Sequence, residues 1–375
     1  MRHPEPHIFH LTPETLGDWC AQRKWPKFRA KQILEWVYEK GVADPHAMSN
    51  LAKREREQLA AEMTFLSGDT LSHQSASDGT QKLLIQWTDA GASPLPIVGQ
   101  SANDPARQTE CVMIPSLDRS PGGTPTRRTA CISSQVGCPV GCKFCASGLG
   151  GLDGNLSAGR IVEQVWRLSR LPGVERISNI VFMGMGEPLA NFASVIHAVR
   201  TIAAPWGMGI GARKITISTV GLPKAIERLA QELELPVTLA LSLHAPNDEL
   251  RRKLIPWSSY TTIEELLGAC AKWFDKTGRE ITLEYILLGG VNDRPQHAEE
   301  LAEVASTLRA NVNLIRYNEV DGMPFERPAT GDVRRFQEIL TQRGVNAHIR
   351  ASRGRDIAAA CGQLRHESNK AESGA

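Results

Sequence analysis

From residue 129 onward, short apolar runs alternate with amphipathic helical patterns, and this alternation constrains the fold more than any other feature. The runs are rich in Ile, Val and Leu at successive positions, which is typical of strands buried on both faces of a parallel sheet. Strands are predicted at 129–133, 177–184, 214–220, 237–244, 281–288, 311–318 and 347–352, with helices between them at 157–171, 190–204, 223–233, 262–276, 295–308 and 332–343. The pattern predicts an α/β fold, a partial (β/α)6-type barrel with its site at the carboxyl ends of the strands.

The part of the chain before this alternation has a different character. Thr12 and Pro13 are typical of a helix start, and helices are also predicted over 27–41 and about 50–63. The basic residues of 27–41 fit either a solvated helix face or a contact surface for an RNA backbone. The segment 71–89 predicts a hairpin that turns at Asp78-Gly79.

These patterns divide the chain into four parts. We predict an N-terminal accessory RNA-binding domain, helical with a hairpin, over 1–90, and a linker or insertion rich in Pro, Ser and Gly over 91–128. The barrel domain is predicted over 129–364 and a disordered tail over 365–375.

Composition narrows the class of protein. The formal net charge is only +2, so a nucleic-acid surface has to come from local clusters of Lys and Arg. No apolar run is long enough to span a bilayer, and the first residues lack the pattern of a signal peptide, so we expect a cytoplasmic protein without a membrane partner. Eight cysteines are too few for a disulfide scaffold and point instead to metal or redox chemistry.

Three of these cysteines form the motif Cys138-x3-Cys142-x2-Cys145, just after the first predicted strand of the barrel. A structural zinc site needs four ligands, and Cys131 lies seven residues upstream, which is awkward for one compact loop. A [4Fe–4S] cluster held by three cysteines leaves one iron open, and S-adenosylmethionine (SAM) can bind there. The alternative is a zinc ribbon within an RNA-binding module.

Other polar residues follow the predicted strands. Gly186 and Glu187 belong to the turn MGMGEP at 183–188, where glycines allow close approach to a ligand. Ser218, the run Ser242-Leu243-His244, and Asn318 end three further strands. Each is unremarkable alone, but together they ring one end of the predicted barrel, as a ligand site requires.

With these motifs the chain resembles the RlmN/Cfr family of radical SAM RNA methyltransferases. The resemblance runs from about Leu11 to Leu364 and is carried by the stretches FRAKQILEWVYEKG, CISSQVGCPVGCKFCASG, GMGEPLANF, ITISTVGLPKAI, LALSLHAPNDELRRKLIP, LEYILLGGVND and RGRDIAAACGQL. It implies that Cys138, Cys142 and Cys145 hold one [4Fe–4S] cluster. It also implies that SAM is contacted by Gly186, Glu187, Ser218, Ser242, Leu243, His244 and Asn318.

The resemblance also implies a mechanism with two SAM molecules. Cys361 is methylated by the first, and a radical made from the second removes a hydrogen from that methyl group, so that the carbon adds to adenine. Glu110 is implied as the proton acceptor, and Cys131 then attacks the sulfur of Cys361, which releases the product and leaves a transient disulfide. A reductant such as a flavodoxin or ferredoxin system is implied as a partner, and we expect a monomer.

The implied product is adenosine methylated at carbon 2, in 23S rRNA at the peptidyl-transferase centre and in tRNA 3′ of the anticodon. Methylation of carbon 8, as by Cfr-type members, another RNA target, and a non-catalytic RNA-binding module that contains a metal are the alternatives. Arg316 stands where the family commonly has Pro, and the stretches 90–108 and 116–128 are insertions. Cys270 shares a helical face with apolar residues and is interpreted as core, whereas Cys20 and Cys111 have no assigned role.

Overall fold

The protein is described by a computed structural model that covers residues 1–89, 104–118, 120, 123 and 125–364. The predicted tail at 365–375 and part of the predicted linker, residues 91–103, 119, 121–122 and 124, lie outside the described residues. The helices are α1 Pro13–Gln22, α2 Phe28–Leu34, α3 Lys53–Glu62, α4 Ala158–Leu168, α5 Phe192–Ala203, α6 Pro223–Glu232, α7 Asp248–Leu254, α8 Ile263–Thr277, α9 Pro295–Ser306 and α10 Thr330–Gln342. The strands are β1 Gly68–Ser75, β2 Gln81–Trp87, β3 Gln108–Pro115, β4 Arg128–Cys131, β5 Gln135–Gly137, β6 Leu152–Asn155, β7 Asn179–Phe182, β8 Ile215–Thr219, β9 Thr238–Ser242, β10 Ile281–Leu287, β11 Ala310–Arg316 and β12 Ala347–Arg350.

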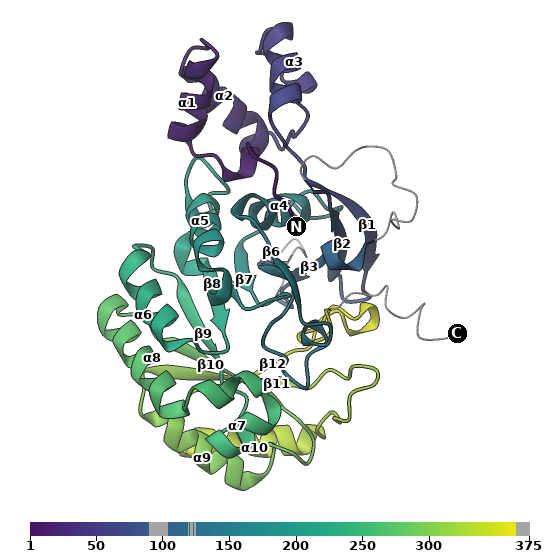
Figure 1. Ribbon diagram of the computed structural model, residues 1–375. Helices are drawn as coiled ribbons and strands as arrows, with labels where there is room; N and C mark the ends of the chain where they lie inside the picture. Colours follow the sequence, from purple (N-terminus) through teal and green to yellow (C-terminus); the bar gives the residue numbers. More distant parts are fainter. Residues whose placement is uncertain (90–103, 119, 121–122, 124, 365–375) are drawn as a thin grey trace.

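Ten of the described strands form one sheet in the order β1-β2-β3-β4-β7-β8-β9-β10-β11-β12. Each neighbouring pair from β4 to β12 is parallel, and the helices after β4 lie on the outer side of the curved sheet (Figure 1). The predicted partial (β/α)6-type barrel is therefore confirmed, because β4 and β7 to β11 are each followed by a helix and β12 closes the series. The barrel is open, since β4 pairs with β3 on its other side and not with β12.

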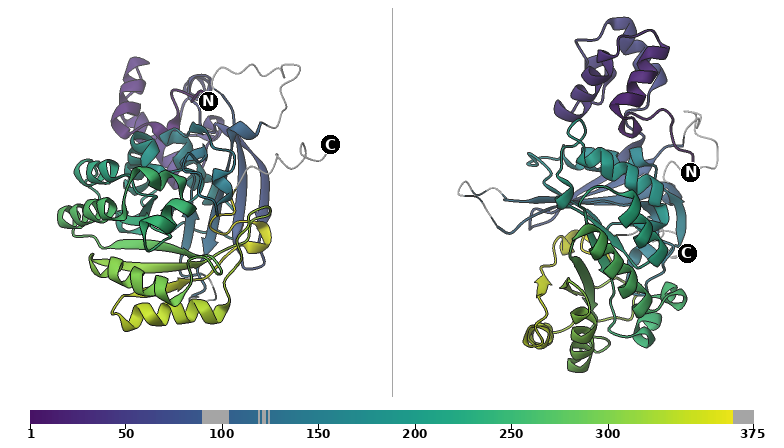
Figure 2. Two further views of the ribbon diagram at one scale, coloured as in Figure 1. Left: turned by 60° about the horizontal axis from the view of Figure 1, so that its bottom comes forward. Right: turned by 90° about the vertical axis from the view of Figure 1, so that its left-hand side faces the viewer.

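The local signals at the helix ends act as the sequence predicts. Thr12 accepts a hydrogen bond from the backbone of Thr15, and Pro13 occupies the first turn of α1. Thr262 and Glu265 form a reciprocal capping box at the start of α8, which ends at Gly278 in a left-handed conformation with φ of +64°. α1, α2 and α3 project from one end of the barrel (Figure 2).

The hairpin of β1 and β2 turns at Asp78-Gly79 as predicted, but it belongs to the barrel sheet and not to the helical domain. β2 pairs with β3, and β3 pairs with β4, so the hairpin extends the sheet beyond its parallel part. The prediction of a linker was wrong over Gln108–Pro115, which forms β3. Its register is stabilised by strands on both sides, and such long-range pairing has no signal in the local sequence.

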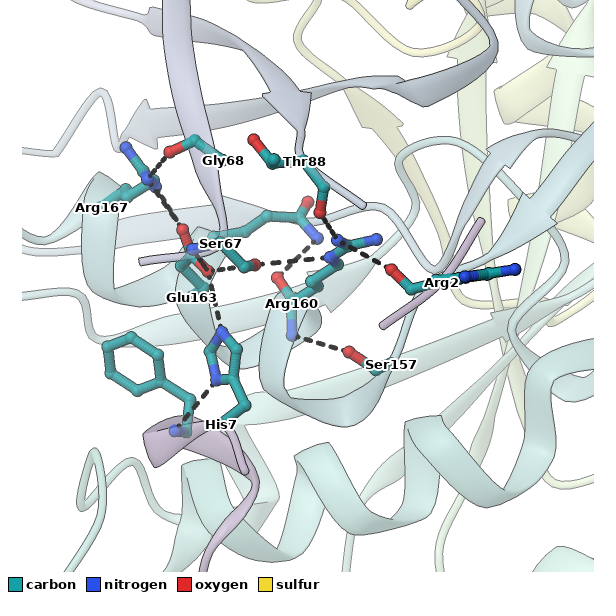
Figure 3. A network of polar contacts seen from close by, with 11 residues as sticks. Arg2, His7, Ser67, Gly68, Thr88, Ser157, Arg160, Glu163 and Arg167 are labelled. Carbon is teal, nitrogen blue, oxygen red and sulfur yellow. Dashed lines mark hydrogen bonds and ion pairs between the residues drawn. The ribbon is translucent and has the colours of Figure 1, made fainter. Parts of the chain in front are cut away.

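A buried polar network joins the N-terminal segment to the barrel (Figure 3). One carboxylate oxygen of Glu163, on α4, accepts hydrogen bonds from the backbone and hydroxyl of Ser67 at 2.9 and 2.7 Å and lies 3.2 Å from Nε2 of His7. Its other oxygen accepts from Arg167 at 2.9 Å. Both oxygens of this buried carboxylate have hydrogen-bond partners. The network therefore fixes how the N-terminal domain packs against α4.

Two short elements had no counterpart in the sequence prediction. α7 is a seven-residue helix capped by Asn247, and β5 and β6 form a small antiparallel pair before α4. Both are too short to show a clear period in the sequence. Within the described ranges, no helix combines the length and the apolarity that a membrane span requires.

Candidate active site

The cysteine motif lies in a tight loop directly after β5. Gly137 has φ of +74°, and a Cβ there would lie 2.0 Å from the carbonyl oxygen of Gly151, so the turn needs glycine. The backbone N–H of Cys138 donates to that same carbonyl at 2.8 Å, and the N–H of Cys145 donates to the carbonyl of Cys142 at 3.1 Å. These turns place all three cysteines on the wall of one cavity.

The three thiols suit an iron–sulfur cluster. Burial raises the pKa of each, to about 12 for Cys138, and neighbouring sulfurs raise the pKa of Cys142 further. Buried thiols that repel one another once ionised become thiolates only beside strong positive charge, which iron ions supply. A structural zinc ion needs four ligands, whereas this loop supplies three cysteines, the number that a cluster with one open iron takes.

The cavity lies at the carboxyl ends of the parallel strands. It holds about 840 Å³ of space, open mouth included. Successive strands from β7 to β12 contribute Phe182, Ser218, Ser242, Glu284, Ile315 and Arg350 to its wall. The strands therefore bring several of the predicted residues to one cavity, and their role in binding a ligand stays a prediction.

Gly186 and Glu187 line this cavity after β7. Gly186 has φ of +102°, and a Cβ there would meet Gln135 at 2.6 Å. The carboxylate of Glu187 is buried and accepts backbone hydrogen bonds from Leu189 at 3.0 Å and Val220 at 2.8 Å. Burial raises the pKa of Glu187, and these hydrogen bonds oppose the rise. The carboxylate thus ties the loops after β7 and β8 together while it faces the cavity.

Ser218, Ser242 and His244 line the same wall. The two serine hydroxyl oxygens lie 3.1 Å apart, and Nδ1 of His244 accepts the backbone N–H of Ile286 at 3.1 Å. Burial, with a contribution from the charge of Arg251, lowers the pKa of His244 to about 3. The imidazole is therefore neutral and carries its proton on Nε2, where it is a hydrogen-bond donor.

Two residues that the sequence assigned to SAM do not line this cavity. Leu243 is fully buried in the core. Asn318 lines a second cavity of about 380 Å³, and its Nδ2 donates to the carbonyl oxygen of Cys361 at 3.3 Å. Ile315, Arg350 and Cys361 line both cavities, so the two spaces adjoin and Cys361 stands at their boundary.

The two distant cysteines of the predicted relay come close together. Cys131 ends β4 and is buried, whereas Cys361 lies beyond β12 on the cavity wall. Burial raises the pKa of Cys131 to about 12, with a further rise from Cys361 and a lowering from Arg350. The charge of Cys361, ahead of Glu284 and Cys131, raises the pKa of Arg350. All eight cysteines are free thiols in this structure.

Glu110 lies in the middle of β3 and lines neither of the two cavities. It is buried, and its Oε1 lies 2.7 Å from Nζ of Lys82 on β2. The same Nζ donates to the carbonyl oxygen of Ala358 at 3.4 Å, three residues before Cys361. The structure therefore brings Glu110 close to the segment that carries Cys361, through Lys82.

Sequence reasoning missed Lys82 and Arg350. Arg350 ends a strand of the barrel, a position that marks functional residues in such folds, so that signal was available. Lys82 lies on the face of β2 opposite to the core residues Leu83 and Ile85, and alternation predicts a solvated face there. The chain segment that covers this face comes from the C-terminal end, which no local pattern reveals. Cys270 is fully buried in α8, as predicted.

Comparisons with known proteins agree with this geometry. The family described as Ribosomal RNA large subunit methyltransferase N-terminal domain matches residues 7–65, and the Radical SAM superfamily matches residues 132–304. The "Probable dual-specificity RNA methyltransferase RlmN" of Rhodopirellula baltica is 42% identical over 360 residues, which are 96% of this chain and 90% of that protein. The "Dual-specificity RNA methyltransferase RlmN" of Dichelobacter nodosus is 38% identical over 366 residues, 96% of this chain and 93% of that protein.

Among solved structures, the crystal structure of a radical SAM methyltransferase from Sphaerobacter thermophilus is similar over nearly the whole chain. It has a TM-score of 0.86 and 41% sequence identity, and the match covers 96% of this chain and 99% of that one. The likeness therefore includes the N-terminal helices and the hairpin as well as the barrel.

Proposed function

The chain belongs to the RlmN family of radical SAM RNA methyltransferases, and from that premise we propose that it methylates carbon 2 of adenosine in 23S rRNA and in tRNA. The observation that carries the proposal is that the three-cysteine loop and Cys361 line one cavity, with Cys131 close by. A methyltransferase that passes a methyl group directly to its substrate needs none of these cysteines. The relatives named as dual-specificity enzymes support two classes of RNA substrate, and the match of residues 7–65 supports large-subunit rRNA as one of them.

In this proposal Cys138, Cys142 and Cys145 hold one [4Fe–4S] cluster. When bound, the cluster and a SAM molecule at its open iron supply a 5′-deoxyadenosyl radical. The residues assigned to SAM are Gly186, Glu187, Ser218, Ser242, Leu243, His244 and Asn318. His244 contributes a neutral N–H donor, and the buried Glu187 holds two of the surrounding loops in place.

Cys361 carries the methyl group. Its sulfur displaces the methyl of a first SAM, because carbon 2 of adenine and a SAM methyl are both electrophilic and do not react with each other. Removal of one hydrogen from this methyl group leaves a carbon radical on Cys361, which adds to carbon 2. The bound cluster would accept one electron from this adduct, and Glu110 takes its ring proton. Cys131 attacks the sulfur of Cys361, which forms a disulfide and releases the methylated base.

The partners follow from this chemistry. The Cys131–Cys361 disulfide has to be reduced after each turnover, and the cluster needs an electron, so we infer a donor such as a flavodoxin or ferredoxin system. The N-terminal helices are proposed to contact RNA, since Lys27, Lys31 and Lys40 are exposed there and Phe28 is 57% exposed beside them. Basic side chains bind phosphates, and an exposed aromatic ring can stack on a base. We infer that one chain acts alone.

The test is expression of the gene in a bacterium that lacks its own enzyme, followed by mass spectrometry of rRNA and tRNA nucleosides. We expect 2-methyladenosine in both RNA classes. 8-Methyladenosine would instead favour the Cfr-type reaction. Cys361→Ala should abolish methylation and retain RNA binding, and Cys270→Ala, a core cysteine in α8, is the matched control. Absence of both products with the intact enzyme contradicts the proposal.

A further inference from the structure

Lys82 is a charged side chain that the proposed mechanism does not use, and it is almost completely buried. It is 3% exposed, and its partner Glu110 is 1% exposed, with 2.7 Å between Nζ and Oε1. Nζ also donates to the carbonyl oxygen of Ala358 at 3.4 Å. The ammonium group thus contacts both the proposed proton acceptor and the segment that carries Cys361.

Stability alone does not explain a buried ion pair of this kind. Removing two charges from water costs more than their attraction commonly returns, and apolar residues of similar volume are often equally or more stabilising. Leu84 shows that the same face of β2 accommodates an apolar side chain two positions along. Lys82 and Glu110 therefore occupy positions at which charge has a use other than stability.

Other ionisable groups lie near this part of β3. The pKa of Cys111, which follows Glu110 in β3, is affected by Cys131 and, on α4, by Glu163 and Arg167. Burial raises the pKa of Cys111 and Cys131, so both thiols are uncharged near neutral pH. Glu163 and Arg167 are paired with each other. A cation next to a buried carboxylate favours its ionised form, and Nζ of Lys82 lies 2.7 Å from Oε1 of Glu110.

We propose that Lys82 is a positioning residue that keeps Glu110 ionised and directed toward the RNA adduct, and that it couples this carboxylate to the segment carrying Cys361. The inference rests on the proposed function. In the step concerned, the C–H bond at carbon 2 breaks, an O–H bond forms on Glu110, and the electron pair stays with the base. Lys82 is then left beside a neutral acid, which is unfavourable for a buried cation. The ion pair reforms when the proton passes to solvent on product release.

The proposal predicts a defect in one step only. In Lys82→Met, made in the full-length enzyme with its cluster, Cys361 should still be methylated and the covalent adduct with RNA should still form. Release of RNA from the adduct should slow by about tenfold or more. A tenfold change corresponds to a change of about one in the pKa of the Glu110 carboxyl. The pH of half-maximal release should move upward, because a carboxyl group without its cation ionises only at higher pH. Peptide mass spectrometry follows the methyl group, and denaturing gels at a series of pH values follow the adduct.

The controls separate this role from a purely structural one. Asp356→Asn weakens another contact of the same segment, the 2.8 Å bond from the backbone of Ser77, and leaves the ion pair in place. It should release RNA at the wild-type rate with the wild-type pH profile. Lys82→Arg keeps the charge and should restore most of the rate. Lys82→Gln keeps a donor for Ala358 without the charge, so it supplies the same test as Lys82→Met if that variant does not fold.

Release at the wild-type rate and pH profile in Lys82→Met or Lys82→Gln would overturn the inference. Equal slowing by Asp356→Asn without a change of pH profile would also overturn it, since loosening of the segment would then explain the effect. A wild-type enzyme that methylates no RNA would contradict the proposed function itself, so the two failures can be told apart.

Discussion

Among single residues, Arg350 shows best how a positive charge next to the cavities interacts with the reactive cysteines. Its guanidinium lies at the boundary of the two cavities, and its Nη1 is 3.5 Å from the sulfur of Met183. The charge on Cys361 is the largest cause of the raised pKa of Arg350, which shows that the guanidinium and the sulfur of Cys361 lie close together. A thiolate is the form of cysteine that attacks a methyl group or a sulfur.

Arg350→Met should therefore slow methylation of Cys361 by SAM in the absence of RNA. One lost charge in a partly buried setting is worth on the order of 1.4 kcal/mol, which is about a tenfold change in rate. Arg350→Lys should retain most of the rate, because it keeps a positive charge beside the sulfur. A methylation rate in Arg350→Met that equals the wild type at every pH would contradict this role.

Sequence motifs predicted which cysteines the fold brings together. Cys138, Cys142 and Cys145 were predicted to converge, and the structure brings them to one cavity. Cys131 and Cys361 were predicted to meet, and they lie close enough for Cys361 to affect the pKa of Cys131. Lys82 was missed because its partner lies on a strand paired through long-range contacts. Roles in binding and catalysis stay predictions, since no ligand fixes them.

At the scale of elements, α4 anchors the N-terminal part of the chain. Glu163 contacts the segment before α1 through His7, the start of β1 through Ser67, and its own helix through Arg167 (Figure 3). Burial alone would raise the pKa of Glu163, but the hydrogen bond and charge of His7, the charge of Arg167 and the hydrogen bond from Ser67 bring it below its usual value. The network thus stabilises the ionised carboxylate.

This shift sets a pH dependence of stability. A carboxyl group whose pKa is lower in the folded chain contributes stability that is fully present above its unfolded value, about 4.3, and is lost as the pH falls through the folded value. Glu163→Gln should lower the free energy of unfolding by about 3 kcal/mol at pH 7, because it breaks a buried charged network. The difference from wild type should shrink as the pH falls below about 4. Urea unfolding at several pH values measures it.

The exposed pair of Arg228 and Glu232 on α6 provides the control, since Glu232→Gln should leave the unfolding midpoint unchanged at every pH. A deficit in Glu163→Gln that does not vary with pH would show that packing, and not the charge of Glu163, stabilises this junction.

Elements with a strong internal period were predicted well, and elements defined by their partners were not. The run that became β10 is buried at six of its seven positions, because both faces of a parallel sheet are covered. β3 is flanked by a Pro-rich stretch and owes its conformation to pairing with β2 and β4. α7 is too short to show a helical period and depends on its cap at Asn247.

For the whole molecule, the decisive feature is the return of the chain to the start of the barrel. The segment after β12 lies beside the hairpin of β1 and β2, which is distant from it in sequence (Figures 1 and 2). Contacts from Asp78 to Arg353 and Gly354 hold it there. This return brings Cys361 close to Cys131. The parallel sheet is thus the scaffold, and the hairpin and the C-terminal segment complete the site.

The most direct test of a methyl-cysteine relay is an isotope measurement. The enzyme, reconstituted without air, is given RNA and SAM whose methyl group carries three deuterium atoms, and the methyladenosine is analysed by mass spectrometry. In the relay, the methyl group on Cys361 loses one hydrogen atom before its carbon is joined to the base. We expect methyladenosine with two deuterium atoms and 5′-deoxyadenosine with one. Methyladenosine that keeps all three deuterium atoms would mean direct transfer and would contradict the role of Cys361.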